Sequence, residues 1–432
     1  MQNIIQTIGR LNKIALPLIF TNLVGVATVL ADQAIIGRIS TEAFNAVGAA
    51  GALFSLVAGI VGYISVQFTI TGGKAFVNDK SDFDDEFSSA IVLNVILGLA
   101  FFAFFIVLNR PIFSIIYGFD GTTLEMAVSY ANIMSIYMLL QLLMFNFGAF
   151  FKIKQNTKWI MIVSAIAGFV NLALDFVFIL GLGFGVRMAA VSNVIGLAVG
   201  VGLYAYLCRH EIKIISARRK IYKQKMGNVI KNSLPLMGQE ILEGGVFAVV
   251  IMSVIARLGD YQLSAYIILT HIIGFALLPV YMYGTAILTL VSQAKEARDF
   301  TILPKAGLFI SSVIYVVLGI LLFIFRGFLP AIITDNSDII GIASSFMLLM
   351  VASNFFVASS VVYKYSLQAM GFSKFVLYQT AIVNILAIIA LIVAIFAFDM
   401  QLHGVFAVLL LNYLALSVIY GVKYKKIVKE KD

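Results

Sequence analysis

The sequence predicts an all-α integral membrane protein, with twelve transmembrane helices arranged in two pseudo-symmetric six-helix lobes. The prediction rests on an apolar composition, on twelve apolar runs of membrane-spanning length, and on a one-sided distribution of basic residues. Hydrophobic residues make up 61% of the 432 positions and charged residues only 12%. A water-soluble domain carries about 25% charged residues, so lipid must be the solvent for most of this chain.

The apolar runs have the length that a membrane-crossing helix needs, which is about 20 residues. They lie at 14–37, 47–72, 87–108, 127–150, 160–182, 188–208, 230–255, 263–292, 305–328, 341–363, 375–398 and 402–421. Continuous apolarity over such lengths indicates helices, because a membrane β-barrel shows short segments of alternating character. Residues 1–13 are expected to form a brief amphipathic lead-in, with no cleavable signal before the first span.

The basic residues predict the orientation of these spans. With the N-terminus in the cytoplasm, the termini and even-numbered loops hold 25 of the 30 Lys and Arg residues, including the run Arg218-Arg219-Lys220. The odd-numbered loops hold only Arg38, Arg110, Arg187, Arg257 and Arg326. Because cytoplasmic loops carry the excess of positive charge, both termini are predicted to be cytoplasmic, in the cell (inner) membrane. The net charge of +9 then reflects topology and contact with anionic lipids rather than binding of nucleic acid.

A weak internal repeat predicts the two lobes. Leu16-Pro17-Leu18 recurs as Leu234-Pro235-Leu236, 218 residues later. We therefore expect an N-lobe at 1–208, a basic cytoplasmic linker at 209–231, and a C-lobe at 232–432. Six helices per half make the repeat parallel, and substrate sites in such proteins lie near the membrane midplane, between or within the halves.

Several classes of function are excluded or disfavoured by what the sequence lacks. The single Cys208 excludes an intrachain disulfide and a cysteine-rich metal site. No Walker, HExxH or GxSxG pattern is present, and the glycines of 181–185 are interpreted as a tight turn between spans. No loop is long enough for a folded soluble domain. We therefore expect neither an enzyme nor a protein that needs a cofactor.

Two acids and two amides inside N-terminal spans form the first candidate site. Asp32, Asn171, Asp175 and Asn193 are all predicted in the outer half of the membrane, and Asn171 lies one helical turn before Asp175. Charged groups in lipid are costly, so such residues are expected to serve a function. The group could bind a proton, because burial disfavours a charged carboxylate, or its oxygen atoms could hold Na⁺. The alternative is one permanently neutral carboxyl that only bonds neighbouring helices.

A second candidate group lies in the C-terminal half. Glu243 falls within the seventh predicted span, and Glu240 lies three residues earlier on roughly the same face. The two carboxyls could attract a cationic substrate, or Glu240 could simply be solvated near the membrane edge. Other polar residues inside predicted spans could line a cavity or face another helix: Gln33, Gln67, Gln141, His271 and Asn354.

The sequence resembles the multidrug and toxic compound extrusion (MATE) family of the MOP superfamily over nearly its whole length. The resemblance is carried by Leu16-Pro17-Leu18 with Asp32-Gln33-Ala34-Ile35-Ile36-Gly37-Arg38, by Asn171-Leu172-Ala173-Leu174-Asp175, by Gly185-Val186-Arg187-Met188-Ala189-Ala190, and by Glu243-Gly244-Gly245-Val246-Phe247-Ala248. It implies that Asp32, Asn171, Asp175 and Asn193 form the N-lobe cation site of the DinF-type branch, although Asn193 replaces a hydroxyl residue common there. Glu243 matches the span-7 carboxylate of the NorM-type branch, but span 10 has Asn354 and no acid.

The resemblance further implies a MATE-like fold and export of small amphipathic, often cationic or aromatic compounds against inward flow of H⁺ or Na⁺. The expected partners are a small-molecule substrate and membrane lipids, and the expected state is a monomer. A lipid-linked saccharide flippase of the same superfamily is the alternative. Flippases tend to place Lys or Arg in the central cavity, and no cation lies in the middle of a predicted span. A channel remains a further alternative, which steady conductance without substrate exchange would reveal.

Overall fold

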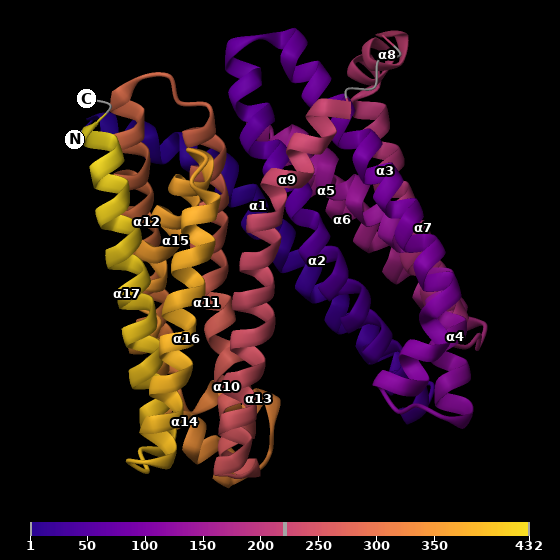
Figure 1. Ribbon diagram of the computed structural model, residues 1–432. Helices are drawn as coiled ribbons and strands as arrows, with labels where there is room; N and C mark the ends of the chain where they lie inside the picture. Colours follow the sequence, from indigo (N-terminus) through magenta and orange to yellow (C-terminus); the bar gives the residue numbers. More distant parts are fainter. Residues whose placement is uncertain (1, 219–222, 431–432) are drawn as a thin grey trace. The chain divides into compact units, whose positions relative to one another are not determined.

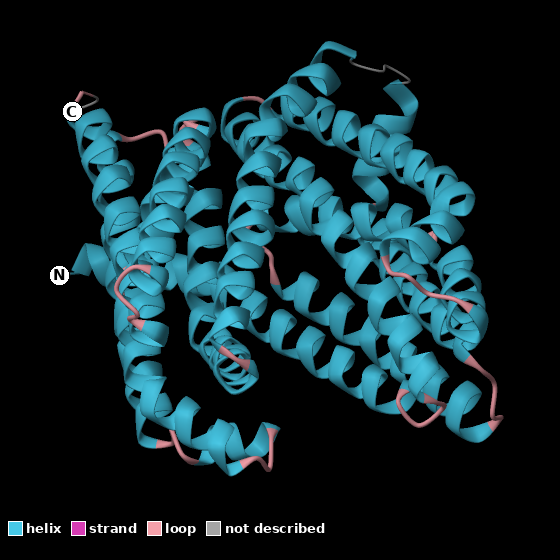
Figure 2. Cartoon of the chain, turned by 60° about the horizontal axis from the view of Figure 1, so that its bottom comes forward, coloured by secondary structure: helices cyan, strands magenta, loops and turns pink. Residues whose placement is uncertain are grey.

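The computed structural model describes residues 2–218 and 223–430, and nearly all of them lie in helices (Figure 1, Figure 2). Within these ranges the chain contains no β-strand. By length and apolar character, eleven of the described helices could cross a membrane, or twelve if a bent pair counts as one span. The bent pair consists of α4 (Gly121–Met134) and α5 (Tyr137–Ile153), which meet at 45°. The predicted all-helical membrane fold is therefore confirmed.

The chain divides into two compact units, and one of them is formed by Leu16–Ser233. Its elements are α1 (Gln2–Ile36) from residue 16 onward, α2 (Thr41–Asn78), α3 (Lys80–Pro111), η1 (Ile112–Ile116), α4, α5, α6 (Lys158–Asp175), η2 (Phe176–Gly181), α7 (Val186–Leu207), α8 (Arg209–Arg218) and the start of α9 (Lys223–Glu240). Helices α2, α3 and α5 pack against one another, and α6 packs along α7 (Figure 1). Buried apolar side chains such as Phe54, Phe113 and Met138 fill its core.

The other unit combines the described part of Met1–Ala15 with that of Leu234–Asp432. Its further elements are η3 (Ile241–Phe247), α10 (Ala248–Ile255), η4 (Ala256–Leu258), α11 (Asp260–Ser292), α12 (Ala297–Ile324), α13 (Phe328–Ile333), α14 (Ser337–Ser353), α15 (Val357–Ala369), α16 (Ser373–Phe396) and α17 (Gln401–Lys429). Helix α11 packs against α12, α14 and α15, and α17 packs against α15 and α16 (Figure 1).

The first residues of the chain belong structurally to this second unit. Leu11 is fully buried, the Tyr283 hydroxyl donates a hydrogen bond to Asn12 Oδ1 at 2.6 Å, and Arg10 lies 3.5 Å from Asp299. Instead of a brief lead-in before a first span at 14–37, the structure has one continuous helix, α1, that begins at Gln2. These contacts explain the difference, because they give residues 2–15 a packing partner far away in the sequence.

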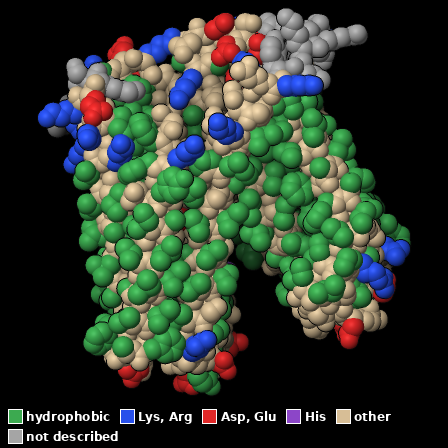
Figure 3. Space-filling view, viewed as in Figure 1, with side chains coloured by type: hydrophobic (Ala, Val, Ile, Leu, Met, Phe, Trp, Pro, Cys, Tyr) green, Lys and Arg blue, Asp and Glu red, His purple; other side chains and the backbone are tan. Residues whose placement is uncertain are grey.

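Side-chain polarity on the surface follows the expected membrane setting. In Figure 3, apolar side chains cover the flanks of the helices, and Lys, Arg, Asp and Glu gather near the helix ends. Large apolar side chains such as Phe169 and Val107 are 74% and 72% exposed. Water would oppose such exposure over contiguous patches, whereas lipid tails tolerate it.

Two boundaries differ from the predicted ones. Residues expected to form the linker at 209–231 are partly helical, because they include α8 and the start of α9, while Arg219 and Lys220 lie outside the described residues. The tenth span was predicted to end at residue 363, but α15 continues to Ala369 and includes Lys364. The helix can accommodate this cation because an acid on another helix pairs with it, as described below.

Candidate functional site

The four predicted residues of the N-terminal cluster come together between α1, α6 and α7. Asp175 is the last residue of α6 and is fully buried, and Asn171 is 5% exposed. The Asn171 amide donates a hydrogen bond from Nδ2 to Asp175 Oδ2 at 3.2 Å. Asp32 of α1 lies within interaction distance of Asp175 and of Asn193, whose amide donates from Nδ2 to the Ala189 carbonyl at 3.2 Å. The polar residues of these three helices therefore lie together.

A fifth member, Ser192, was missed by the sequence analysis. Its side chain is fully buried on α7, where the hydroxyl donates a hydrogen bond to the Met188 carbonyl at 2.9 Å and lies close enough to Asp175 to interact with that carboxyl. The resemblance led us to expect a hydroxyl at the position of Asn193, and the structure has one at the neighbouring residue. The only available signal was a small hydroxyl residue beside Asn193 in an apolar helix, which many helices share.

The contact between Asp32 and Asp175 has a direct chemical consequence. Two carboxylates cannot hydrogen-bond to each other unless one of them carries a proton, because ionised oxygens only accept. Within the described residues, the Oδ1 atoms of Asp32 and Asp175 are both buried without a hydrogen-bond partner. Buried acceptors without a partner are costly. The cluster therefore has unused oxygen atoms at which a proton or a cation would be stabilised.

Close backbone approach places the helices that carry this cluster. A Cβ atom on Gly196 of α7 would lie 2.8 Å from the Ala167 carbonyl oxygen and 3.0 Å from Asn171 Cβ. A Cβ atom on Gly168 of α6 would lie 2.9 Å from the hydroxyl of Thr28 on α1. An added side chain at Gly196 would meet backbone that cannot turn aside, and one at Gly168 would force the Thr28 side chain to shift. Immediately after Asp175 the chain widens into the π-helical turn η2, a feature that often marks functional sites.

A second polar cluster lies within the C-terminal unit. The Lys364 ammonium donates to Glu243 Oε2 at 2.9 Å, and Gln239 donates from Nε2 to Glu243 Oε1 at 3.0 Å. Gln368 in turn donates from Nε2 to Gln239 Oε1 at 2.7 Å. Gln239 and Glu243 are four residues apart, and so are Lys364 and Gln368, so each of these two pairs lies on one face of its helix. Glu243 lies in the π-helical segment η3, and Lys364 and Gln368 lie in α15.

This cluster includes a cation, Lys364, that lies inside a candidate membrane-spanning helix, beyond the predicted end of the tenth span. The apolar run was read as ending just before Lys364, because a lysine in lipid is costly. Glu243 offsets that cost by a direct ion pair. A possible signal in the sequence was the spacing of Lys364 and Gln368, which repeats the spacing of Gln239 and Glu243.

The remaining predicted residues are distributed over both units. Glu240 is half-buried, and a Cβ on Gly244 would lie 3.0 Å from its Oε1 atom. Asn354 is buried where α14 ends, and its amide donates to the Met350 carbonyl at 2.9 Å, which makes it a local helix-end contact. The others differ in exposure: Gln67 is buried, Gln141 is half-buried, and Gln33 and His271 are exposed.

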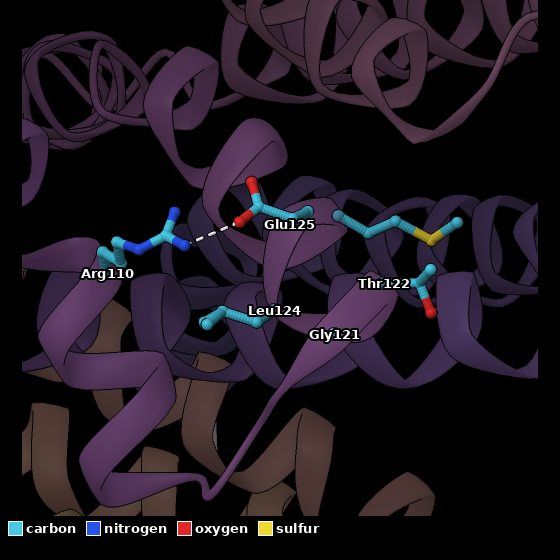
Figure 4. Close-up of a pocket in the computed structure, with 6 residues that line it drawn as sticks. Arg110, Gly121, Thr122, Leu124 and Glu125 are labelled. Carbon is cyan, nitrogen blue, oxygen red and sulfur yellow. Dashed lines mark hydrogen bonds and ion pairs between the residues drawn. The ribbon is translucent and has the colours of Figure 1, made fainter.

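An open pocket lies apart from both clusters, beside the turn that joins α3 to α4. It has a volume of about 610 Å³ and is lined by Arg110, Gly121, Thr122, Leu124, Glu125 and Met126 (Figure 4). Its one ion pair joins Arg110 to Glu125 at 2.7 Å, and these side chains are 58% and 62% exposed. Exposed pairs of this kind contribute little energy, and the lining includes no member of either cluster.

Comparisons with known proteins agree with the all-helical membrane fold. The family model described as MatE matches residues 17–177 and 235–393. A protein named "Probable multidrug resistance protein NorM" from Thermotoga maritima is 24% identical over 344 residues, which cover 77% of this chain and 73% of that protein. The "Uncharacterized transporter YisQ" of Bacillus subtilis is 23% identical over 367 residues, covering 82% of this chain and 79% of its own.

Solved structures show the same fold. A crystal structure of MATE in complex with MaD3S superimposes with a TM-score of 0.89 at 15% identity, covering 98% of this chain and 96% of that chain. A MOP superfamily transporter from Pyrococcus furiosus gives a TM-score of 0.86 at 14% identity, with 98% and 96% covered. At such low identity the likeness establishes the arrangement of helices rather than the ligand.

Proposed function

We propose, on the premise that the chain belongs to the MatE family, that it is a secondary active transporter that exports small amphipathic, cationic or aromatic compounds. Inward flow of H⁺ or Na⁺ would drive this export. The observation that supports the proposal most directly is the close pair of carboxyls, Asp32 and Asp175, whose Oδ1 atoms are buried without a partner within membrane helices. A neutral structural role would need only one acid and no unused buried oxygen atoms.

The coupling step follows from the chemistry of this pair. When a proton is bound, Asp32 and Asp175 share a hydrogen bond and hold α1 against α6. When the proton leaves, two negative charges face each other in a medium that screens them poorly, and they repel. The close fit of Gly168 against Thr28 then transmits the change to α1, which contains Pro17. Proline weakens a helix locally, so α1 can bend there at low cost.

Sodium is the other coupling cation that the same residues could bind. Hard cations prefer oxygen ligands, and the cluster offers carboxylate, amide and hydroxyl oxygens from Asp32, Asp175, Asn171, Asn193 and Ser192. Na⁺ would replace the proton between the two carboxylates and remove the same repulsion. Both cations therefore lead to one mechanism, in which the occupied cluster and the empty cluster favour different shapes of α1.

Purified protein in liposomes tests the proposal. Ethidium, a cationic aromatic dye, would be exported when a pH gradient or a Na⁺ gradient is imposed, and protein-free liposomes give the background. Asp32→Asn and Asp175→Asn should each abolish gradient-driven export, because an amide cannot bind and release a proton. Asp338→Asn, in an exposed first turn, is the matched control and should transport normally. Full export by both cluster variants would refute coupling at this site.

The proposal extends to location and organisation. The distribution of basic residues supports a cell-membrane protein with cytoplasmic termini, and the repeat supports functional lobes at 1–208 and 232–432 joined by 209–231. The expected partners are the exported compound and membrane lipids, with a monomer as the transporting unit.

Flipping of a lipid-linked saccharide is the second candidate function. Lys364 inside a membrane helix favours it, since an anionic pyrophosphate lipid needs cations along its path. Glu243 pairs with this lysine and cancels its charge, which favours export of cations instead. Liposomes that translocate a pyrophosphate-linked lipid, and do not export ethidium, would support the flippase.

A further inference from the structure

The ion pair of Lys364 and Glu243 is unusual for its setting within membrane helices. The two side chains are 14% and 29% exposed, so they are neither sealed in the core nor fully solvated. Residual access matters, because a fully enclosed pair could only be structural. Here a ligand of suitable size could reach the Glu243 carboxylate by displacing the Lys364 ammonium.

The described hydrogen bonds of this cluster form a chain that ends at the Glu243 carboxylate. Lys364 donates to one carboxylate oxygen and Gln239 donates to the other. Gln368 holds Gln239 in the orientation that directs its NH₂ group at the carboxylate. The two glutamine side chains therefore fix the Glu243 carboxylate from one side. The ammonium, at the end of a flexible four-carbon stem, is therefore the partner that can move away.

Aromatic rings border the same place. Lys364 lies over the ring of Tyr365, with 5.6 Å between the ammonium and the ring centroid. Tyr281 of α11 is close enough to interact electrostatically with both Lys364 and Glu243. A Cβ on Gly284 would lie 2.6 Å from the Tyr365 ring, so α11 and α15 hold these rings in place. Aromatic faces beside a carboxylate are the surroundings that an organic cation prefers.

We propose that Lys364 is a tethered cation that occupies the binding position of the exported compound's positive charge. A lipophilic organic cation binds by displacing the Lys364 ammonium from Glu243 and stacking against the neighbouring tyrosines. After release, Lys364 returns and leaves Glu243 paired. This inference rests on the proposed export of cations, and it adds a specificity-determining residue that competes with the substrate.

The rival explanation is a permanent bridge that only joins α15 to η3. The two explanations predict opposite changes in ligand affinity when Lys364 is replaced. A bridge predicts weaker ligand binding, because losing it disorders the cluster. A tethered competitor predicts tighter binding, because the carboxylate is then unpaired and strongly favours any cation that reaches it.

Equilibrium dialysis of radiolabelled tetraphenylphosphonium against the full-length protein in non-ionic detergent distinguishes them. Its charge is independent of pH, and no ion gradient is needed. Lys364→Met should bind roughly tenfold more tightly than the unaltered protein. Lys364→Arg keeps the pair and should bind with nearly unaltered affinity. Glu243→Gln should lose most of the binding, and Lys374→Gln, at an exposed position, is the control.

The outcomes separate this inference from the proposed function. If the unaltered protein binds the cation but Lys364→Met binds equally or more weakly, the tethered-cation role is wrong while export stands. Should Lys364→Met fail to fold, Lys364→Gln replaces it, since glutamine can still donate to Glu243 without competing as a charge. If neither the unaltered protein nor any variant binds or exports an organic cation, the proposed function itself fails. As a second readout, Glu243→Gln should gain affinity for an aromatic sulfonate, because Lys364 is then an unpaired cation.

Discussion

The hydroxyl of Ser192 supplies the acid pair with a partner of a different chemical kind from the amides of Asn171 and Asn193. A hydroxyl rotates freely about its C–O bond, so it can donate to a carboxylate or turn its lone pairs toward a cation. It donates to the Met188 carbonyl at 2.9 Å and lies beside Asp175, the residue that also contacts Asp32. Ser192 is therefore expected to affect the cation-bound and cation-free states of the cluster differently.

Replacing Ser192 by alanine should identify the coupling ion. If the ion is H⁺, the ionised carboxylate loses a hydroxyl that could turn from the Met188 carbonyl and donate to it, so half-maximal export of ethidium should move to higher pH. If the ion is Na⁺, a ligand is lost, and export should need about fivefold more Na⁺. The measurement is the initial export rate against pH and against Na⁺ concentration.

The matched control for that substitution is Ser135→Ala. Ser135 is also fully buried in the same unit, and its hydroxyl donates to the Ala131 carbonyl at 2.8 Å just as that of Ser192 donates to the Met188 carbonyl, but Ser135 is not among the groups that interact with Asp175. Its removal should leave both ion dependences unaltered. If Ser192→Ala behaved like Ser135→Ala, Ser192 would have no part in the cluster.

Some residues of the clusters could be predicted from the sequence and others could not. Asn171 and Asp175 are spaced by one helical turn, so they were predicted to share a helix face. Acids are costly within membrane spans, so Asp32 and Asp175 could be predicted to belong to one functional site. Serines occur in membrane helices for many reasons, so Ser192 was not. Lys364 was missed because its cost is offset by Glu243, which is 121 residues away. Long-range pairs of this kind leave no periodic signal in a single sequence.

At the scale of elements, the packing of α6 on α7 depends on one small residue. Gly196→Ala should push the two helices apart, because the added Cβ meets the Ala167 carbonyl oxygen at 2.8 Å, a backbone atom that cannot rotate away. We expect a loss of about 1–3 kcal/mol of stability together with impaired coupling. Apparent melting temperature and ethidium export report the two effects.

Gly202→Ala is the control within the same helix. A Cβ at Gly202 meets nothing within 4 Å, and alanine favours helix, so this variant should be as stable as the unaltered protein or slightly more. Equal melting temperatures for both variants would show that α6 and α7 adjust freely. The cluster would then tolerate their movement.

The short helix α8 is tied to the end of α5 by an ion pair between Glu211 and Lys154, whose side chains are 20% and 34% exposed. Burial by itself would raise the pKa of Glu211, but the Lys154 ammonium and a backbone hydrogen bond hold that pKa below its usual value. A carboxyl pKa that is lowered in the folded protein stabilises the fold at pH values above the pKa of the same carboxyl in the unfolded chain. That stabilisation is lost as the pH falls through the folded value.

Hydrogen exchange of α8 tests this tie. Near pH 7, Lys154→Gln should reduce protection of α8 by at most about 1 kcal/mol, as expected for a partly exposed pair. Once the pH has fallen below the lowered pKa of Glu211 in the folded protein, the variant and the unaltered protein should exchange alike, because Glu211 is then protonated in both. A difference that persists at low pH would assign the effect to packing of the lysine stem instead.

Element boundaries were less predictable than the elements themselves. Apolar runs identified the spans, but they stopped short where an outside partner neutralises a charge, as at the end of α15. The bend between α4 and α5 was also not expected, because residues 127–150 are continuously apolar and contain no proline. Hydropathy measures the solvent that a segment prefers, whereas bends depend on neighbours that a single sequence does not reveal.

For the whole molecule, the side of the membrane occupied by each loop can be tested with single cysteines. The native Cys208 is fully buried, so background labelling should be low. Asp120→Cys, before α4, should react with a membrane-impermeant maleimide in intact cells. Lys374→Cys, in the first turn of α16, should react only after the membrane is opened. The reverse pattern would invert the proposed topology.

Helix α1 has a consequence for any attempt to divide the protein. Its residues 2–15 complete the core of the unit that otherwise begins at Leu234, while its remainder belongs to the other unit. A gene cut within 209–231 would produce a second polypeptide that lacks Leu11 and Asn12, which fill and bond its own interior. When both fragments are produced together, residues 2–15 of the first fragment would have to pack into the second fragment. Fragment complementation therefore depends on the first residues of the chain as much as on the site of the cut.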